Sequence, residues 1–252
     1  MKQVTFSSKE DASSYLAKYI IDRINQFAPT PSKPFVLGLP TGSSPEGVYG
    51  KLIEAYKEGK VSFKNVVTFN MDEYIGLKPS NQQSYHYFMF NKFFNHIDIP
   101  RENINILNGL ANNIEEECRR YEAKIKRVGR INLFMGGLGA EGHLAFNEAG
   151  SVRESITRKV TLVESTLKAN SRFFNNDTSK VPSHALSVGI STILDNSDEI
   201  VIIVLGKSKA FALEKTLYGT KNDAKYPSSY LQDHHNVMVV CDNEAAGLRA
   251  KL

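Results

Sequence analysis

The fold is decided by the stretch Ile131-Asn132-Leu133-Phe134-Met135, which runs directly into Gly136-Gly137-Leu138-Gly139-Ala140-Glu141-Gly142-His143. The apolar run at 131–135 predicts a short buried strand, and the glycines predict that this strand ends there. In α/β proteins, ligands bind beyond the carboxyl ends of the strands. The stretch therefore predicts an α/β sheet with a candidate site in its glycine-rich loop.

Similar apolar runs alternate with longer amphipathic stretches along the rest of the chain. The predicted strands are residues 35–37, 66–69, 104–107, 131–135, 200–205 and 237–241, and the predicted helices are residues 9–26, 45–57, 84–95, 114–127, 165–174 and 208–217. This alternation is typical of a parallel sheet. We expect one α/β domain over residues 1–252, a Rossmann-like, mostly parallel sheet with helices on both faces.

Composition narrows the classes of protein that fit. A chain of 252 residues with 41% hydrophobic residues can bury one substantial core. The net charge of +4 is modest and the basic residues form no run, so no nucleic-acid partner is expected. With two cysteines, no apolar leader and no stretch that could span a bilayer, the sequence predicts a cytoplasmic protein without a membrane partner. A homo-oligomer is compatible with these observations.

The glycine-rich loop also carries acid and base groups. Glu141 and His143 flank a glycine, and Glu148 follows five residues after His143. An imidazole oriented by carboxylates is a recurring form of general acid/base site. Asp72, in Asn70-Met71-Asp72-Glu73-Tyr74, follows another predicted strand and can act as a base that removes a carbon-bound proton, although a helix cap or surface acid is an alternative.

The same glycines support a second hypothesis. Gly137, Gly139 and Gly142 satisfy the G-x-G-x-x-G pattern of dinucleotide-binding folds, and Glu164 lies at about the expected spacing, after a possible strand at residues 159–163. However, Asn147 and Gly150 stand where the crossover helix should begin, and the motif is not on the first strand. A dehydrogenase is therefore the weaker alternative, and plain turn glycines are a third.

An anion site is predicted after the first strand, in Gly38-Leu39-Pro40-Thr41-Gly42-Ser43-Ser44-Pro45. Ser44 can cap the following helix, and free backbone N–H groups there would face an anion. The loop lacks the lysine of a nucleotide P-loop, so it favours a sugar phosphate over ATP. Arg172 and Lys209 are candidate cations for the same phosphate, although each could also be a solvated surface charge.

Several long motifs resemble the glucosamine-6-phosphate deaminase family, and the resemblance covers nearly the whole chain. They are Gly38-Leu39-Pro40-Thr41-Gly42, Val67-Thr68-Phe69-Asn70-Met71-Asp72-Glu73-Tyr74, Phe134-Met135-Gly136-Gly137, Gly142-His143-Leu144-Ala145-Phe146-Asn147-Glu148 and Asn170-Ser171-Arg172-Phe173-Phe174. The resemblance implies a hydrolase/isomerase that converts glucosamine 6-phosphate to fructose 6-phosphate and ammonia in amino-sugar catabolism, with no metal or organic cofactor.

The resemblance also implies roles for individual residues. His143, with Glu141 and Glu148, would assist opening of the sugar ring, and Asp72 would move a proton from C2 to C1. Gly42, Ser43, Ser44, Arg172 and Lys209 would bind the phosphate. The alternatives are a lactonase-like hydrolase acting on 6-phosphogluconolactone, and a sugar-phosphate sensor without catalysis.

Two features depart from the family pattern. Glu141 stands where the family usually has Asp or Asn, and the chain ends at Leu252, short of the tail that contributes to the effector site of activated members. Ser151, Arg158 and Thr161 resemble other parts of that site. We therefore expect little or no activation by N-acetylglucosamine 6-phosphate.

Overall fold

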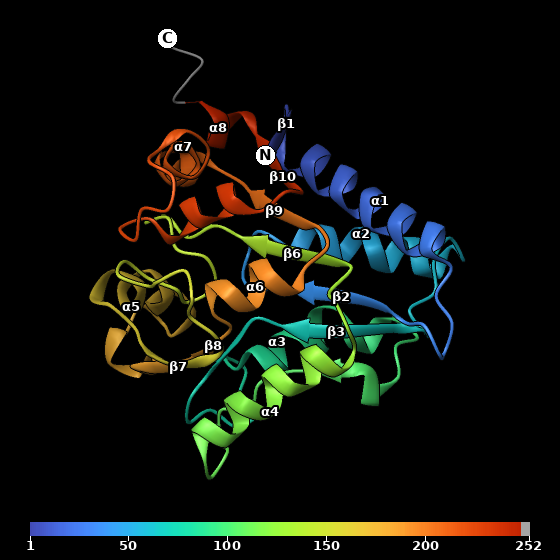
Figure 1. Ribbon diagram of the computed structural model, residues 1–252, viewed down its shortest axis with the longest axis horizontal. Helices are drawn as coiled ribbons and strands as arrows, with labels where there is room; N and C mark the ends of the chain where they lie inside the picture. The colour runs from blue at the N-terminus through green and yellow to red at the C-terminus, as the bar shows by residue number, and fades with distance from the viewer. Residues whose placement is uncertain (248–252) are drawn as a thin grey trace.

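The computed structural model describes residues 1–247, and its centre is a seven-stranded parallel sheet (Figure 1). The strand order is β1-β10-β9-β6-β2-β3-β5. The strands span β1 Lys2–Phe6, β2 Phe35–Leu39, β3 Val66–Asn70, β5 Ile104–Asn105, β6 Leu133–Gly137, β9 Ile200–Val204 and β10 Val237–Asp242. Every residue of β2, β3, β9 and β10 is buried, which explains the near-continuous apolar runs of these strands.

Helices cover both faces of this sheet. Alternate residues of β2 show the division, because Leu37 and Leu39 pack with α1 and α2 whereas Val36 packs with α4 and α6. The helices are α1 Lys9–Phe27, α2 Glu46–Lys57, α3 Tyr85–Lys92, α4 Ile114–Arg127, α5 Glu164–Asn170, α6 Ile190–Asn196, α7 Ala210–Tyr218 and α8 Asn243–Ala246. The predicted parallel sheet with helices on both faces is confirmed.

The order of the strands fixes where a ligand can bind. From β2 the chain moves outward through β3 to β5, and it then returns to pair β6 with the other edge of β2. The loops that leave β2 and β6 therefore diverge at their carboxyl ends. Such a switch point opens a crevice at the end of a parallel sheet, and both predicted loops lie there.

Several elements differ from the sequence-based expectations. A small antiparallel sheet, in the order β4-β8-β7, lies beside α5 (Figure 1) and was not predicted, although β7 overlaps the possible strand at residues 159–163. Its strands span β4 Asp72–Tyr74, β7 Arg158–Thr161 and β8 His184–Ser187. The elements β1 and α6 were not predicted either. Between residues 1 and 247, no helix is long and apolar enough to cross a membrane.

Candidate active site

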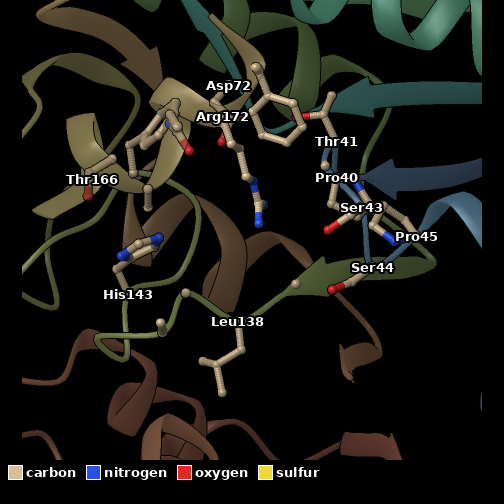
Figure 2. A pocket seen from close by; sticks show the side chains of 18 of the residues that line it. Pro40, Thr41, Ser43, Ser44, Pro45, Asp72, Leu138, His143, Thr166 and Arg172 are labelled. Atoms are coloured by element: carbon tan, nitrogen blue, oxygen red, sulfur yellow. The ribbon is translucent and has the colours of Figure 1, made fainter. Parts of the chain in front are cut away.

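A cavity of about 650 Å³ opens at the carboxyl ends of β2, β6 and β9. The sequence predicted nine residues of a functional site. Eight of them line this cavity: Gly42, Ser43, Ser44, Asp72, Glu141, His143, Arg172 and Lys209. Asp72 and His143 thus line the same cavity. Figure 2 shows Arg172 extending into this cavity, with the Ser43 and Ser44 loop on one side and His143 on the other.

Asp72 is the first residue of β4 and is only 6% exposed. Its Oδ1 atom is buried without a hydrogen-bond partner among the described residues. Burial raises the pKa of Asp72 well above its ordinary value, and the charge of the adjacent Glu73 adds to this effect. Because a general base works best when its pKa approaches the working pH, this environment suits proton abstraction.

His143 packs against the glycine-rich loop at unusually short range. A Cβ atom built on Gly139 would lie 2.1 Å from His143 Nε2, so any larger residue there would displace the imidazole. The Gly139 N–H donates to the His143 carbonyl oxygen at 3.0 Å. No helix follows Gly142, and residues 143–157 form turns and bridges instead. The glycines thus make room for a histidine, and the dinucleotide-binding alternative lacks its helix.

The imidazole of His143 is neutral at physiological pH. Burial lowers the pKa of His143 to about 4, and the positive charge of Lys209 contributes to the shift. A neutral imidazole can accept a proton at one nitrogen and donate one from the other. His143 can therefore relay a proton between two oxygens of a bound sugar.

The two carboxylates expected beside His143 are placed differently. Glu141 lines the cavity in an exposed position, and its carboxylate forms no hydrogen bond or ion pair with any residue between 1 and 247. The longer side chain of Glu141 is therefore not anchored to the imidazole in this structure.

Glu148 is the one predicted residue that does not line the cavity. The loop reverses at Ala145, which has a φ of 52°, and Asn147 N–H donates to the Leu144 carbonyl oxygen. Glu148 consequently lines a separate hollow, where its Oε2 atom accepts from Val163 N–H at 2.9 Å. The predicted contact between Glu148 and His143 is not formed, because the loop reverses between the two residues. The spacing of these residues in the sequence did not indicate this reversal.

One end of the cavity combines hydroxyls, backbone groups and two cations. The Gly42-Ser43-Ser44 loop lines this end of the cavity, and Gly42 adopts the left-handed backbone conformation, with a φ of 96°. Burial lowers the pKa of Lys209 to about 8, and the nearby charge of Arg172 contributes to the shift. The positive charges of Arg172 and Lys209 repel each other, and a bound dianion would stabilise both of them.

The predicted cap in the Gly42-Ser43-Ser44 loop is wrong. Ser44 does not cap α2, because the N-cap position is Pro45 and no side chain caps the helix there. The Ser44 hydroxyl lines the cavity instead, where it is available to a ligand.

Further residues line the cavity that the sequence did not single out, among them Lys9, Gln82, Gln83, Tyr85, Thr166 and Lys207. Lys207 sits two residues before Lys209, so its proximity was visible in the sequence, whereas Lys9 becomes part of the site through the unpredicted pairing of β1 with β10.

The second hollow measures about 390 Å³ and includes the residues that resembled an effector site. Ser151, Arg158 and Thr161 line it. Arg158 donates to the Asn147 side-chain oxygen at 2.8 Å and to the Ser151 hydroxyl at 3.2 Å. Arg158 therefore already has hydrogen-bond partners within its own protein.

Comparison with known proteins gives consistent matches over the whole fold. Residues 7–240 match the family model described as glucosamine-6-phosphate isomerases/6-phosphogluconolactonase. A glucosamine-6-phosphate isomerase of Candida albicans is 74% identical over 252 residues, covering 100% of both chains. A glucosamine-6-phosphate deaminase of Glaesserella parasuis is 55% identical over 97% of this chain and 92% of its own length.

A solved structure supports the same relationship. It is described as a monomeric glucosamine-6-phosphate deaminase and superposes with a TM-score of 0.93 at 41% identity. The match covers 99% of this chain and 100% of the other.

Proposed function

The chain belongs to the family of glucosamine-6-phosphate isomerases and 6-phosphogluconolactonases, and we propose that it is an enzyme that converts glucosamine 6-phosphate and water to fructose 6-phosphate and ammonia. The observation that carries this proposal is the shared cavity, in which a buried carboxyl and a neutral imidazole face a pair of cations. A sugar phosphate held at the cations would present its reacting carbons to Asp72 and His143. Holding the remote phosphate positions the substrate and stabilises the transition state.

The proposed reaction begins with ring opening. His143 takes the proton of the C1 hydroxyl and returns a proton to the ring oxygen, which produces the open-chain aldehyde. Its neutral form at physiological pH permits both transfers. Of the two predicted carboxylates, Glu141 lines the cavity together with His143 and would stabilise the transient positive charge on the imidazole, whereas Glu148 lines the second hollow and acts only if its loop rearranges.

Asp72 carries the isomerisation. Its carboxylate removes the C2 proton, which gives an enolamine, and returns a proton to C1, which leaves a C2 imine. Water then adds to C2 and ammonia departs. Hydrolysis is thus only the last step, so the name hydrolase expected from the sequence describes the reaction incompletely.

The isomerase and lactonase branches of the family differ in what they release. The relatives at 74% and 55% identity are named for glucosamine 6-phosphate, which favours the amino sugar over a lactone as the substrate. We further propose that the whole chain works as one domain. We place it in the cytoplasm, since both cysteines are free and buried as expected in a reducing compartment.

The function is tested by incubating the purified protein with glucosamine 6-phosphate without added metal. We expect ammonia and fructose 6-phosphate in equal amounts. Hydrolysis of 6-phosphogluconolactone without ammonia release from the amino sugar would favour the lactonase. Tight binding of glucosamine 6-phosphate without turnover would favour a sensor.

The protonation of Lys209 predicts how ligand binding depends on pH. Because its pKa is lowered to about 8, Lys209 is charged below that pH and loses its charge as pH rises through it. The phosphate of fructose 6-phosphate is already a dianion in this range, since its second pKa is about 6. The affinity for fructose 6-phosphate, measured by calorimetry, should therefore fall as pH rises through about 8.

The control is Lys209→Arg, which keeps its charge over the whole range. This variant should bind with an affinity that changes little across the same interval. An equal loss of affinity in both proteins would assign the pH dependence to another group.

A further inference from the structure

Glu73 follows Asp72 in β4 but does not line the cavity, and it is only 3% exposed. Its carboxylate accepts three backbone hydrogen bonds. Tyr74 N–H and Tyr85 N–H donate to Oε1 at 2.8 and 2.9 Å, and His86 N–H donates to Oε2 at 2.8 Å. One carboxylate therefore joins the strand that carries Asp72 to the first turn of α3.

These contacts account for the free donors at the start of α3. The first N–H groups of a helix have no partner within it. Ser84 is the N-cap, and its hydroxyl accepts from Tyr87 N–H at 3.0 Å, while Glu73 accepts from the two preceding N–H groups. A carboxylate at this end also interacts favourably with the helix dipole. The start of α3 is thus satisfied by Ser84 and Glu73 together.

The helix anchored in this way forms part of the cavity wall. Ser84, Tyr85 and Phe88 line the cavity. The ring of Tyr85 contacts that of Tyr74 with centroids 4.8 Å apart, and the Tyr74 hydroxyl accepts from Asn170 Nδ2 at 2.8 Å. Displacing the start of α3 would therefore move side chains that border Asp72.

We infer that Glu73 is a positioning residue for the proposed reaction: its carboxylate fixes α3 to β4 and so holds Asp72 and Tyr85 in their places on the cavity wall. This inference rests on the proposed function for its kinetic consequences. It also gives Glu73 an electrostatic effect, because the charged form of its carboxylate adjoins the base. Burial raises the pKa of Glu73, and the three backbone donors oppose that rise by stabilising the charged form.

The groups around Asp72 show how that charge acts. Burial is the larger reason for the raised pKa of Asp72, and the charge of Glu73 is the second. The titratable and charged groups that face Asp72 are Tyr49 from α2, Tyr74 from β4, Tyr85 from α3, Tyr121 from α4 and, across the cavity, Glu141, His143, Arg172 and Lys209. The four phenols have raised pKa values and are neutral at physiological pH.

The test is Glu73→Gln, which keeps the shape but loses the charge and turns one acceptor into a donor facing an N–H group. We expect kcat to fall at least about tenfold, because small displacements of a catalytic group are costly. The affinity for inorganic phosphate should stay within about twofold, since the phosphate residues lie elsewhere. Removing the charge of Glu73 should also lower the pKa of Asp72, which shifts the acidic limb of the pH profile of kcat/KM to lower pH.

A matched control separates positioning from general stability. Glu122 is also buried, at 8% exposure, and accepts hydrogen bonds from Thr157 N–H, the Thr157 hydroxyl and the Thr192 hydroxyl. It does not line the cavity. Glu122→Gln should lower thermal stability but leave kcat and the acidic limb unchanged.

The outcomes are distinct from those of the functional test. If Glu73→Gln matches Glu122→Gln in kcat and pH profile, the inference is overturned even though the wild type releases ammonia. If the wild type releases no ammonia, the attachment of α3 to β4 by Glu73 is still tested by amide hydrogen exchange. Exchange at residues 84–88 should then accelerate in Glu73→Gln and not in Glu122→Gln, and equal exchange in both would overturn the inference.

Discussion

Asp72→Asn should lower kcat for ammonia release by about 10²–10⁴-fold, because it removes the base that carries the C2 proton and keeps the shape of the side chain. The substitution breaks no hydrogen bond of Oδ1, which has no partner among the described residues. Since burial already penalises the charged carboxylate, the neutral amide should fold at least as well. Steady-state kinetics and thermal melting measure both effects.

The control for this prediction is Asp198→Asn, which removes a surface carboxylate that pairs with Arg130. That variant should keep wild-type turnover. Asp72→Asn should retain the affinity for fructose 6-phosphate, because the phosphate residues are unchanged. Turnover near the wild-type rate in Asp72→Asn would show that another group moves the proton.

The central sheet could be predicted because its strands are buried on both faces. In β9, Ile200–Val204, all five residues are apolar and buried, so a continuous hydrophobic run marks the strand. β1, Lys2–Phe6, gives no such pattern because it lies at the edge of the sheet and is largely exposed. Its formation depends on parallel pairing with β10, a contact between the two ends of the chain.

The small sheet escaped prediction for a different reason. β4 is only Asp72–Tyr74 and contains two acids, a composition unfavourable to strands. It forms because β8 pairs with it in antiparallel register and because Glu73 finds backbone donors in α3. Such tertiary partners leave no periodic pattern in the sequence.

The candidate site was predictable where residues directly follow parallel strands. The carboxyl ends of parallel strands meet at one edge of the sheet, and Ser43, Asp72 and His143 all line the cavity at that edge. Glu148 follows a reversal at Ala145, where a non-glycine residue adopts positive φ, and no composition rule indicates this. The acid–base residues Asp72 and His143 could thus be inferred from the sequence. The positions of the carboxylates Glu141 and Glu148 required the structure.

Arg172→Ala should chiefly weaken substrate binding. Arg172 lines the cavity and packs over the Phe173 ring, with 4.6 Å from Cζ to the ring centroid, and under the proposed function it binds the phosphate. A hydrogen bond to a charged group contributes about 1.5–3 kcal/mol, so KM for glucosamine 6-phosphate should rise roughly 10–100-fold with a smaller change in kcat. Arg172→Lys should recover only part of the affinity, because lysine lacks the planar fork that matches phosphate oxygens.

A second consequence follows from the proximity of the two cations. The charge of Arg172 helps to lower the pKa of Lys209, so in Arg172→Ala that pKa should rise, and the loss of fructose 6-phosphate affinity should begin above pH 8. Arg119→Ala, which removes an exposed arginine paired with Glu116, is the control and should change neither KM nor the pH at which binding weakens. A large loss of kcat at unchanged KM would assign Arg172 to the chemical step. An unshifted pH dependence would show that the two cations do not act on the same phosphate.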